Sequence, residues 1–334
     1  MANVAINGFG RIGRQAFKAM LAKKGIEVVA VNDLTDNKTL ARLLQFDSVY
    51  GRFPKEVSAD SQSLAIGGKK IESLSERDPR RLPWKKLKVD VVIESTGVFR
   101  GADQAAMHLK AGAKKVVISA PPKGKPCNQY ILNVNTQDYD PAKEHVVSMA
   151  SCTTNCLAPM IKVLHEKIGI EQGFMTTIHA YTADQNLVDG PHTDPRRARA
   201  AAINMVPTTT GAAKAITTIF PSLEGKLDGM AVRVPLPSGS ITDLTCSLKE
   251  STSAEVVNAL FKQAVSGKLG QNLEYSEKEL VSTDILGNGH GCVFDSKLTK
   301  VNGNTVKLLG WYDNEWGYSS LLADFALFME KKGL

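Results

Sequence analysis

A glycine-rich hexapeptide near the N-terminus constrains the fold more than any other segment. Residues 8–13 (GFGRIG) match the pattern GxGxxG, which follows a β-rich run over 2–7 and opens an amphipathic stretch over 11–23. An acidic residue, Asp33, ends the next β-rich run 20 positions after the last glycine. A strand, a glycine turn, a helix and a second strand with a terminal acidic residue are typical of a dinucleotide-binding βαβ unit. The chain is therefore expected to begin with a Rossmann-like domain.

Each residue of this pattern has a physical task. Gly8 permits the tight turn, Gly10 lets the backbone approach a pyrophosphate, and Gly13 lets the helix pack closely on the strand. The start of the helix offers free N–H groups and a favourable dipole to phosphates. Asp33 is placed to accept hydrogen bonds from ribose hydroxyls and to repel a 2′-phosphate, which favours NAD over NADP.

The first 120 residues continue the alternation of strands and helices. This alternation predicts βαβ units and a parallel sheet. Strands are expected at 27–32, 89–94 and 115–119, a helix at 104–111, and short antiparallel strands and loops over 57–88.

The pattern changes near residue 150. A long helical stretch covers 151–168, a strand is expected at 173–181, and residues 182–210 form a long irregular segment. Loops of that length inside a compact protein are usually functional or lie in an interface. Further strands are expected at 226–234, 240–249, 290–295 and 304–312, with helices at 254–266 and 317–331.

Charge and hydropathy limit the possible classes of protein. The formal net charge is +7, and the basic excess lies in residues 1–150. A basic half suits an anionic ligand, and a non-enzymatic alternative is that it binds RNA or a surface partner. The lysine pairs are interpreted as solvated because they are scattered and form no basic run of five or more: Lys23, Lys24, Lys69, Lys70, Lys85, Lys86, Lys114 and Lys115. Specific nucleic-acid binding is not expected.

No apolar run in the chain is longer than residues 325–329. That run is far too short to span a bilayer, so no membrane association is expected. The N-terminus has no apolar core of a secretory signal, and a cytoplasmic location is expected.

The five cysteines contain no pair of CxxC motifs, so no metal site is expected. Cys152 follows Ser151, a plausible N-cap, at the start of the predicted helix over 151–168. A helix N-terminus is expected to lower the pKa of a thiol in its first turn, which makes Cys152 the candidate nucleophile. The other four are interpreted as small apolar residues: Cys127, Cys156, Cys246 and Cys292.

A thiol nucleophile needs a base. His179 stands at the end of the predicted strand over 173–181, where functional groups collect in α/β folds. The five other histidines read as ordinary helix or surface residues. The sequence pattern alone does not place His179 beside Cys152.

Several motifs occur together in one order along the chain. They are NGFGRIGR (7–14), ERDP (76–79), STGV (95–98), SCTTNCLAP (151–159), HAYTADQ (179–185), RRARAA (196–201), PTTTGAAKA (207–215), RVPLPSGSITDL (233–244) and WYDNEWGYS (311–319). With these motifs, residues 3 to about 325 resemble the phosphorylating glyceraldehyde-3-phosphate dehydrogenase family.

The resemblance implies an α/β fold with two domains. Residues 1–150 would form a Rossmann-like NAD-binding domain to which the C-terminal helix 316–334 returns. Residues 151–315 would form an α+β catalytic domain with a mostly antiparallel sheet. A homotetramer is also implied, with the segment 182–205 packing between subunits.

The resemblance also implies residue roles. Cys152 would be the nucleophile and His179 its base, paired as ions, while Thr182 and Arg233 would hold the phosphate of the substrate. Inorganic phosphate would be held by Ser151, Thr153, Arg197, Thr210 and Gly211. NAD would be contacted by Gly8, Gly10, Arg11, Ile12, Gly13, Asp33, Arg77, Ser119 and Asn314, the last through the nicotinamide carboxamide. Pro191 stands where similar NAD-preferring members carry proline, so it implies the same preference for NAD over NADP as Asp33.

The implied reaction is the oxidative phosphorylation of D-glyceraldehyde 3-phosphate to 1,3-bisphosphoglycerate, in glycolysis or gluconeogenesis, through a hemithioacetal and a thioester on Cys152. The alternatives are an erythrose-4-phosphate dehydrogenase and an NADP-preferring relative. The chain departs from the common family pattern over 123–134 and at Arg100 and Gly190, of which the last two are expected near the cofactor.

Overall fold

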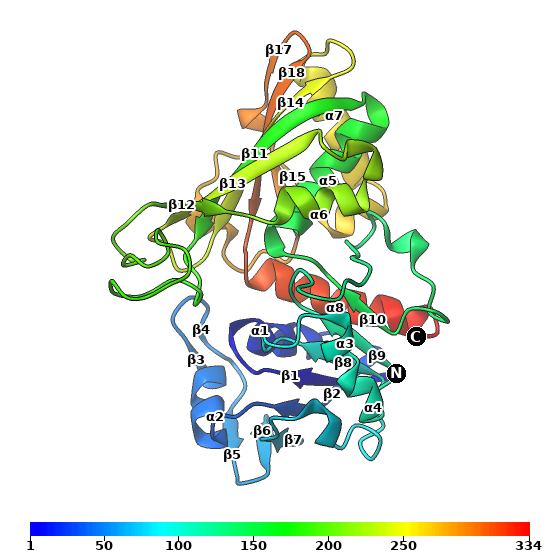
Figure 1. Ribbon diagram of the computed structural model, residues 1–334, viewed down its shortest axis with the longest axis vertical. Helices are drawn as coiled ribbons and strands as arrows, with labels where there is room; N and C mark the ends of the chain where they lie inside the picture. The colour runs from blue at the N-terminus through cyan, green and yellow to red at the C-terminus, as the bar shows by residue number, and fades with distance from the viewer. The chain divides into compact units, whose positions relative to one another are not determined.

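The computed structural model describes all 334 residues, and the chain divides into two compact units (Figure 1). The first unit contains Met1–Tyr130, Asp138–Ala150 and Ser319–Leu334. The second contains Ile131–Gln137 and Ser151–Tyr318.

The first unit is built on an eight-stranded sheet with the order β10-β9-β8-β1-β2-β7-β6-β5. The six strands from β10 to β7 run parallel, and β6 and β5 continue the sheet in antiparallel pairing. The predicted Rossmann-like parallel sheet is therefore confirmed. The strands are β1 (Ala2–Asn7), β2 (Ile26–Asn32), β5 (Val57–Ala59), β6 (Ser63–Ile66), β7 (Lys69–Leu74), β8 (Val91–Glu94), β9 (Lys115–Ile118) and β10 (Val146–Ser148).

The helices of this unit differ in part from the expectation. The expected helix over 104–111 is two short helices, and one helix, α2, was not predicted. The helices are α1 (Arg11–Met20), α2 (Asn37–Gln45), α3 (Ala102–Ala105), α4 (Met107–Lys110) and the end of α8 (Trp316–Lys331), and a small hairpin joins β3 (Phe46–Asp47) to β4 (Gly51–Arg52). The ion pair between Lys23 Nζ and Asp324 Oδ1, 2.5 Å, ties α8 to the loop after α1.

The second unit is built on an eight-stranded sheet, in which seven strands follow the order β12-β13-β11-β14-β18-β16-β15 and β17 pairs with β18. Only the pairs β11–β13 and β15–β16 are parallel, so the mostly antiparallel sheet is confirmed. The strands are β11 (Ile170–Ala180), β12 (Val206–Thr209), β13 (Leu227–Val234), β14 (Ser240–Leu248), β15 (Leu273–Ser276), β16 (Cys292–Asp295), β17 (Lys300–Asn302) and β18 (Thr305–Tyr312). The helices are α5 (Cys152–Lys167), α6 (Ala212–Ile219) and α7 (Ala254–Val265).

The expectation of an irregular segment over 182–210 is wrong at its end. Residues 206–209 form β12, which pairs with β13 in antiparallel register, Thr208 opposite Ala231. The segment from 182 to 205 has neither helix nor strand, as expected.

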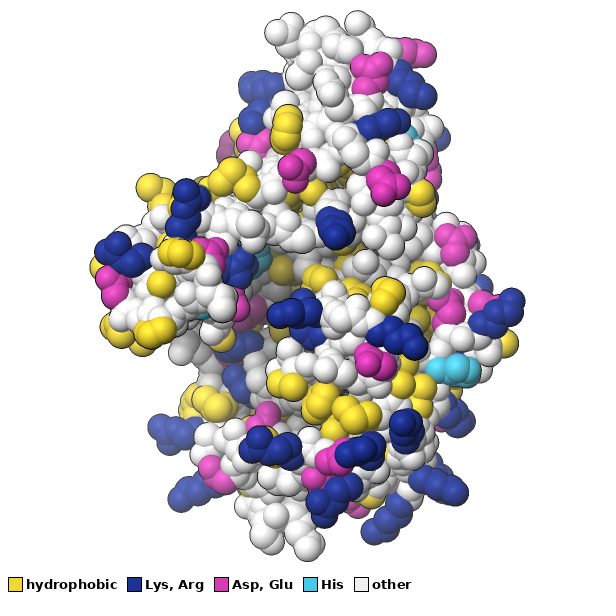
Figure 2. Space-filling model, viewed as in Figure 1, with side chains coloured by type: hydrophobic (Ala, Val, Ile, Leu, Met, Phe, Trp, Pro, Cys, Tyr) yellow, Lys and Arg dark blue, Asp and Glu magenta, His cyan; other side chains and the backbone are white.

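The interpretation of the lysine pairs as solvated is wrong at Lys115. Its side chain is buried on β9, and Nζ donates to the carbonyl oxygens of Pro141 and Glu144. Its neighbour Lys114 is exposed and pairs with Asp90 at 2.8 Å. Figure 2 shows the Lys and Arg side chains of the first unit scattered among acidic and apolar ones rather than gathered in one band. No helix has the length and apolar character needed to cross a membrane.

Candidate active site

A cavity of about 340 Å³ opens at the carboxyl ends of β1, β2 and β8 in the first unit. This edge of a parallel sheet is where α/β proteins bind nucleotides. Four of the residues predicted to contact NAD line it: Gly8, Gly10, Asp33 and Arg77. Arg11, Ile12, Gly13 and Ser119 do not line it, and Asn314 belongs to the second unit.

The glycine turn has the geometry that the pattern requires. Gly8 has φ +91°, and a Cβ there would lie 2.6 Å from the backbone nitrogen of Thr96. A Cβ at Gly13 would lie 2.1 Å from the carbonyl oxygen of Gly8, so the helix can approach the strand only with glycine at that position. A Cβ at Gly10 would meet nothing within 4 Å, which leaves open space in front of the backbone at the start of α1.

The Asp33 carboxylate is fixed by two backbone donors. Oδ2 accepts from the N–H of Phe9 at 2.8 Å, and Oδ1 accepts from the N–H of Thr35 at 2.9 Å. Each oxygen keeps a second lone pair, so the carboxylate can still accept from ribose hydroxyls. The fit to a dinucleotide rests on this fixed acceptor, the glycine turn and the exposed guanidinium of Arg77 on the cavity wall.

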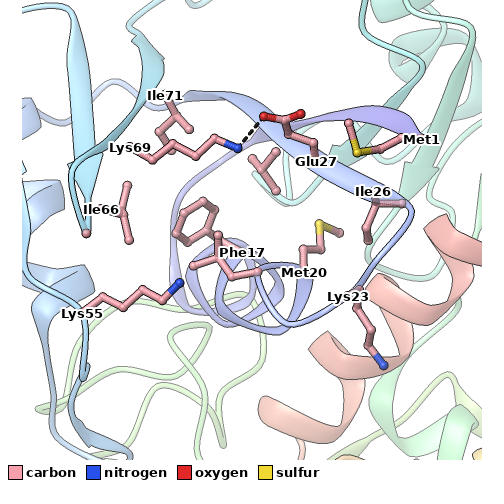
Figure 3. Close-up of a pocket in the computed structure, with 13 residues that line it drawn as sticks. Met1, Phe17, Met20, Lys23, Ile26, Glu27, Lys55, Ile66, Lys69 and Ile71 are labelled. Carbon is pink, nitrogen blue, oxygen red and sulfur yellow. Dashed lines mark hydrogen bonds and ion pairs between the residues drawn. The ribbon is translucent and has the colours of Figure 1, made fainter.

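Sequence reasoning missed several lining residues of this cavity. Thr96 and Phe99 follow β8, and Asn7 and Asn32 end β1 and β2. Their positions at the ends of the predicted strands could have revealed them, because the carboxyl ends of neighbouring parallel strands meet at one edge of the sheet. A second cavity of about 450 Å³ in this unit is lined by Phe17, Met20 and Ile71 and contains none of the predicted site residues (Figure 3).

In the second unit, the predicted nucleophile and base are in contact. Ser151 is the N-cap of α5, and its Oγ accepts from the N–H of Thr154 at 3.1 Å. This cap places Cys152 at the first position of the helix. His179 lies near the end of β11, and its Nε2 is 3.4 Å from Cys152 Sγ.

Hydrogen bonding assigns the tautomer of His179. Nδ1 lies 2.6 Å from the carbonyl oxygen of Ala180, a pure acceptor, and 3.3 Å from Arg233 Nη1, a pure donor. The much shorter contact assigns the proton to Nδ1. Nε2 is then unprotonated and faces the thiol of Cys152. His179 is 4% exposed, and its ring meets the ring of Tyr312 in an edge-to-face arrangement with centroids 5.9 Å apart.

The expected lowering of the thiol pKa is wrong for this structure. Burial raises the pKa of Cys152 to about 11, although Arg233 and the hydrogen bonds with Thr153 act in the opposite direction. Burial, helped by the charge of Arg233, lowers the pKa of His179 to about 3. Both shifts favour a neutral thiol beside a neutral imidazole over the ion pair that the resemblance implied.

Thr182 and Arg233 meet as predicted. The parallel pairing of β11 with β13 sets His179 opposite Arg233. Arg233 Nη1 donates to Thr182 Oγ1 at 3.1 Å and to the carbonyl oxygen of Ala180 at 3.2 Å, while its buried Nε has no partner. A half-buried guanidinium with a spare donor next to the reactive pair is suited to binding an anion.

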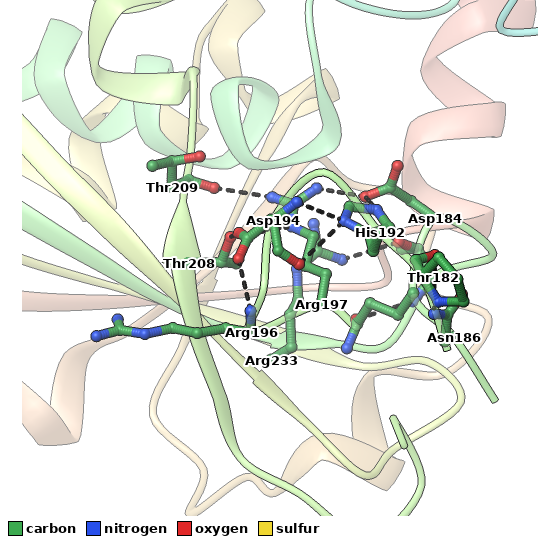
Figure 4. Close-up of polar contacts among 12 residues, drawn as sticks. Thr182, Asp184, Asn186, His192, Asp194, Arg196, Arg197, Thr208, Thr209 and Arg233 are labelled. Atoms are coloured by element: carbon green, nitrogen blue, oxygen red, sulfur yellow. Dashed lines mark hydrogen bonds and ion pairs between the residues drawn. The ribbon is translucent and has the colours of Figure 1, made fainter. Parts of the chain in front are cut away.

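The residues predicted to hold inorganic phosphate lie on three segments. Ser151 and Thr153 begin α5, Thr210 and Gly211 precede α6, and Arg197 lies in the loop over 182–205. Arg197 donates to residues of β12, and no hydrogen bond joins it to Ser151 or Thr153 (Figure 4). Thr153 instead bonds the hydroxyl of Tyr312 at 2.9 Å, and Thr210 Oγ1 accepts from the N–H of Ala212 at 3.2 Å.

The Asn314 side chain is held with its amide group oriented. Its Oδ1 accepts from Ser240 Oγ at 3.0 Å, from the N–H of Gly239 at 3.1 Å and from Ser238 Oγ at 3.3 Å. These bonds leave the Nδ2 group of Asn314 able to donate to a ligand. Sequence reasoning missed Ser240 and Tyr312 as supporting residues, although both lie inside motifs that it had identified.

Comparisons with known proteins cover both units. The family model described as glyceraldehyde 3-phosphate dehydrogenase, NAD binding domain, matches residues 2–102, and the model of the C-terminal domain matches residues 151–314. Glyceraldehyde-3-phosphate dehydrogenase 2 of Streptomyces arenae is 54% identical over 324 residues, 97% of each chain. The glyceraldehyde-3-phosphate dehydrogenases of Mycobacterium avium and Streptomyces coelicolor are 55% and 54% identical over 335 and 329 residues, 98% of each chain.

The chain belongs to the glyceraldehyde-3-phosphate dehydrogenase family.

Membership of this family gives the glycine-turn cavity its ligand. The matching family model is an NAD-binding domain and contains Gly8, Asp33 and Arg77, so the cofactor is NAD, as predicted. The reactive pair of Cys152 and His179 lies within the match to the C-terminal domain. No group of three or more His, Cys, Asp or Glu side chains is arranged to hold a metal ion.

Proposed function

We propose that this protein oxidises D-glyceraldehyde 3-phosphate with NAD and inorganic phosphate to 1,3-bisphosphoglycerate, as in glycolysis and gluconeogenesis. The observation that carries the proposal is the 3.4 Å contact between Cys152 Sγ and the unprotonated Nε2 of His179, with the Arg233 guanidinium beside them. A nucleophile, its base and a cation for the substrate phosphate are the groups that this chemistry needs.

The first step forms a hemithioacetal. His179 Nε2 accepts the thiol proton as Cys152 Sγ bonds to the aldehyde carbon, and His179 returns this proton to the aldehyde oxygen. The high pKa of the buried thiol makes the base necessary at the moment of attack. The N–H of Cys152, at the start of α5, and the imidazole stabilise the oxygen as charge develops.

The second step is oxidation, for which NAD held at the glycine turn would supply the acceptor of the hydride from the former aldehyde carbon. His179 removes the hydroxyl proton as the C–H bond breaks, and a thioester on Cys152 results. A thioester keeps the energy of oxidation in a form that a phosphate oxygen can attack. Phosphate then bonds to the acyl carbon, the Cys152 sulfur leaves, and the proton held by His179 returns to the sulfur.

The proposal assigns two anion positions. Thr182 and Arg233 hold the substrate phosphate, and their 3.1 Å hydrogen bond supports a shared position. Inorganic phosphate binds with Ser151, Thr153, Arg197, Thr210 and Gly211. The NAD contacts are Gly8, Gly10, Arg11, Ile12, Gly13, Asp33, Arg77, Ser119 and Asn314, with the Nδ2 of Asn314 directed to the nicotinamide carboxamide.

The domain division belongs to the same proposal. Residues 1–150 with the helix 316–334 form the NAD-binding domain, and residues 151–315 form the catalytic domain. A cytoplasmic location follows from the proposed metabolic role.

We infer that the protein is a homotetramer. The segment 182–205 exposes several large apolar side chains, and Figure 2 shows apolar side chains on the lobe at the left that this segment forms. Apolar patches of this kind favour association. The exposed fractions are 78% for Leu187, 71% for Val188, 80% for Ile203 and 75% for Met205. Analytical ultracentrifugation tests this state, and a monomer at micromolar concentration would contradict it.

One assay tests the reaction. NADH formation from D-glyceraldehyde 3-phosphate is expected to continue over many turnovers with phosphate and to stop near one turnover without it. Comparable rates without phosphate, or with erythrose 4-phosphate as the preferred aldehyde, would favour the erythrose-4-phosphate dehydrogenase alternative. Comparing kcat/KM for NAD and NADP tests the cofactor preference.

A further inference from the structure

The guanidinium of Arg197 is engaged on each of its three nitrogens (Figure 4). Nε donates to Thr208 Oγ1 at 2.9 Å, Nη2 donates to the carbonyl oxygen of Thr209 at 3.1 Å, and Nη1 donates to the carboxylate of Asp184. The Arg197 side chain is only 18% exposed. These contacts use three of its five N–H donors, so an anion that approaches Nη1 meets the negative charge of Asp184 unless that carboxylate leaves.

Two of the partners are fixed by the sheet. Thr208 and Thr209 belong to β12, which pairs with Ala231 and Met230 of β13. Moving either residue away from Arg197 would break ladder hydrogen bonds. These two contacts therefore orient the guanidinium, and neither residue can give up its place to an incoming anion.

A nearby second carboxylate is also fixed. Asp194 Oδ2 lies 3.7 Å from Arg197 Nε, too far for a hydrogen bond. It accepts from Thr208 Oγ1 at 2.5 Å, and Oδ1 accepts from the N–H of Arg196 at 2.8 Å. Asp194 therefore holds the loop, while its charge adds to the negative potential around Arg197.

Asp184 differs from these partners because it is free to turn away. Its side chain is 55% exposed, and besides Arg197 only the ring of His192, at 3.9 Å, approaches the carboxylate. The Asp184 carboxylate is well solvated when it turns away, and Arg197 then keeps its hydrogen bonds to Thr208 and Thr209. The Asp184 carboxylate can thus leave Arg197 for water at small cost.

We propose that Asp184 is an internal anion that competes with inorganic phosphate for Arg197 and so keeps the affinity of the site for phosphate low. The inference rests on the proposed function, in which Arg197 binds the attacking phosphate. Phosphate takes over the Nη1 donor as the Asp184 carboxylate turns to solvent, and the carboxylate returns when the phosphoryl group departs. Asp184 is then a specificity-determining residue that disfavours retention of any anion at Arg197.

The test removes the negative charge of Asp184 and keeps the size of its side chain. Asp184→Asn is compared with Asp189→Asn, which removes the same charge from the same loop at a residue that pairs with Arg199 at 2.9 Å and is 60% exposed. At constant ionic strength, KM for phosphate is expected to fall about two- to fivefold in Asp184→Asn, the range that exposed ion pairs carry. It should not change in Asp189→Asn or in the charge-retaining variant Asp184→Glu.

A binding measurement separates this inference from the proposed reaction. Calorimetric titration with inorganic phosphate alone should show tighter binding to Asp184→Asn than to the wild type, with no turnover required. A higher KM and weaker binding would mean that Asp184 orients Arg197 rather than competing at it, and would overturn the proposal. Equal changes in both asparagine variants, or none in either, would also overturn it. Absence of phosphate-dependent NADH formation by the wild type would refute the reaction but leave the titration valid.

Discussion

The hydroxyl of Tyr312 links helix α5 to the central strands of the second unit, and its loss should be costly. Thr177 Oγ1 donates to the carbonyl oxygen of Ile241 at 3.2 Å, so it accepts from the Tyr312 hydroxyl at 2.7 Å. Having used its proton there, the tyrosine oxygen accepts from Thr153 Oγ1 at 2.9 Å. Tyr312 is 1% exposed and Thr153 is 4% exposed, so water cannot replace either bond.

The substitution Tyr312→Phe leaves the hydroxyl of Thr153 without its acceptor. A buried donor left unpaired costs about 1–3 kcal/mol, and the lost hydrogen bond to Thr177 adds about 1 kcal/mol. The free energy of unfolding should therefore fall by about 2–4 kcal/mol. For a unit of this size such a loss lowers Tm by roughly 5–10 °C.

Tyr139→Phe is the matched control. Tyr139 is 4% exposed, but its buried hydroxyl has no hydrogen-bond partner. Removing an unpaired hydroxyl should leave Tm unchanged or raise it slightly. Scanning calorimetry of both variants at one protein concentration makes the comparison. A similar loss in both variants, or a loss below about 2 °C for Tyr312→Phe, would refute the assigned hydrogen-bond directions.

Three further predictions follow from charges in the structure. The thiolate is the reactive form, and the pKa of Cys152 is raised to about 11. Its alkylation by iodoacetamide in the protein without substrate should therefore accelerate with rising pH up to about 11; mass spectrometry locates the label, and a plateau below pH 9 would indicate a standing ion pair with His179. Lys115→Met should lower the free energy of unfolding by about 2–4 kcal/mol because the two half-buried carbonyl groups of Pro141 and Glu144 lose their donor. Lys114→Met, at an exposed ion pair, should cost less than about 1 kcal/mol in the same denaturation experiment. An equal loss of stability in the two variants would contradict the burial of Lys115. Asp33→Asn should raise KM for NAD and lower the ratio of kcat/KM for NAD over NADP about tenfold, because the charge that repels a 2′-phosphate is gone; an unchanged ratio in steady-state kinetics would contradict this role.

The architecture of the first unit was largely predictable because its signals are local. The glycine pattern, the strand before it and Asp33 all lie within one βαβ unit. Helix α2 was missed although a signal was present: Asp36 caps it by accepting from the N–H of Thr39 at 2.9 Å. Strand β10 has only three residues, too few for an alternating pattern to be recognised.

Lys115 shows how a correct composition argument can fail at one position. The lysine pairs were interpreted as solvated because they are scattered along the chain, and most of them are exposed. On a strand, however, neighbouring side chains point to opposite faces. Lys114 precedes β9 and faces water, so Lys115, its first residue, points inward to the carbonyl groups of Pro141 and Glu144.

The proximity of Cys152 to His179 depends on tertiary pairing that no local pattern reports. Sequence reasoning recognised the cap at Ser151 and the strand that ends near His179. It could not recognise that the parallel register of β11 and β13 would set His179 opposite Arg233. The motifs of the family predicted the set of residues. The sheet register explains why His179 meets Arg233, and the packing of α5 against β11 brings Cys152 to them.

The state of the Cys152 thiol follows from comparing two opposing effects. A charge at a helix N-terminus gains about 0.3–1 kcal/mol, which is less than one pKa unit. Burial acts the other way and raises the pKa from its ordinary 9.0 to about 11, so desolvation outweighs the helix. The unsubstituted thiol therefore stays protonated at neutral pH, and His179, with a pKa of about 3, is neutral and able to accept its proton. Nucleophilic sulfur is therefore scarce at neutral pH unless His179 takes the thiol proton during the attack, so the base sets how fast Cys152 reacts.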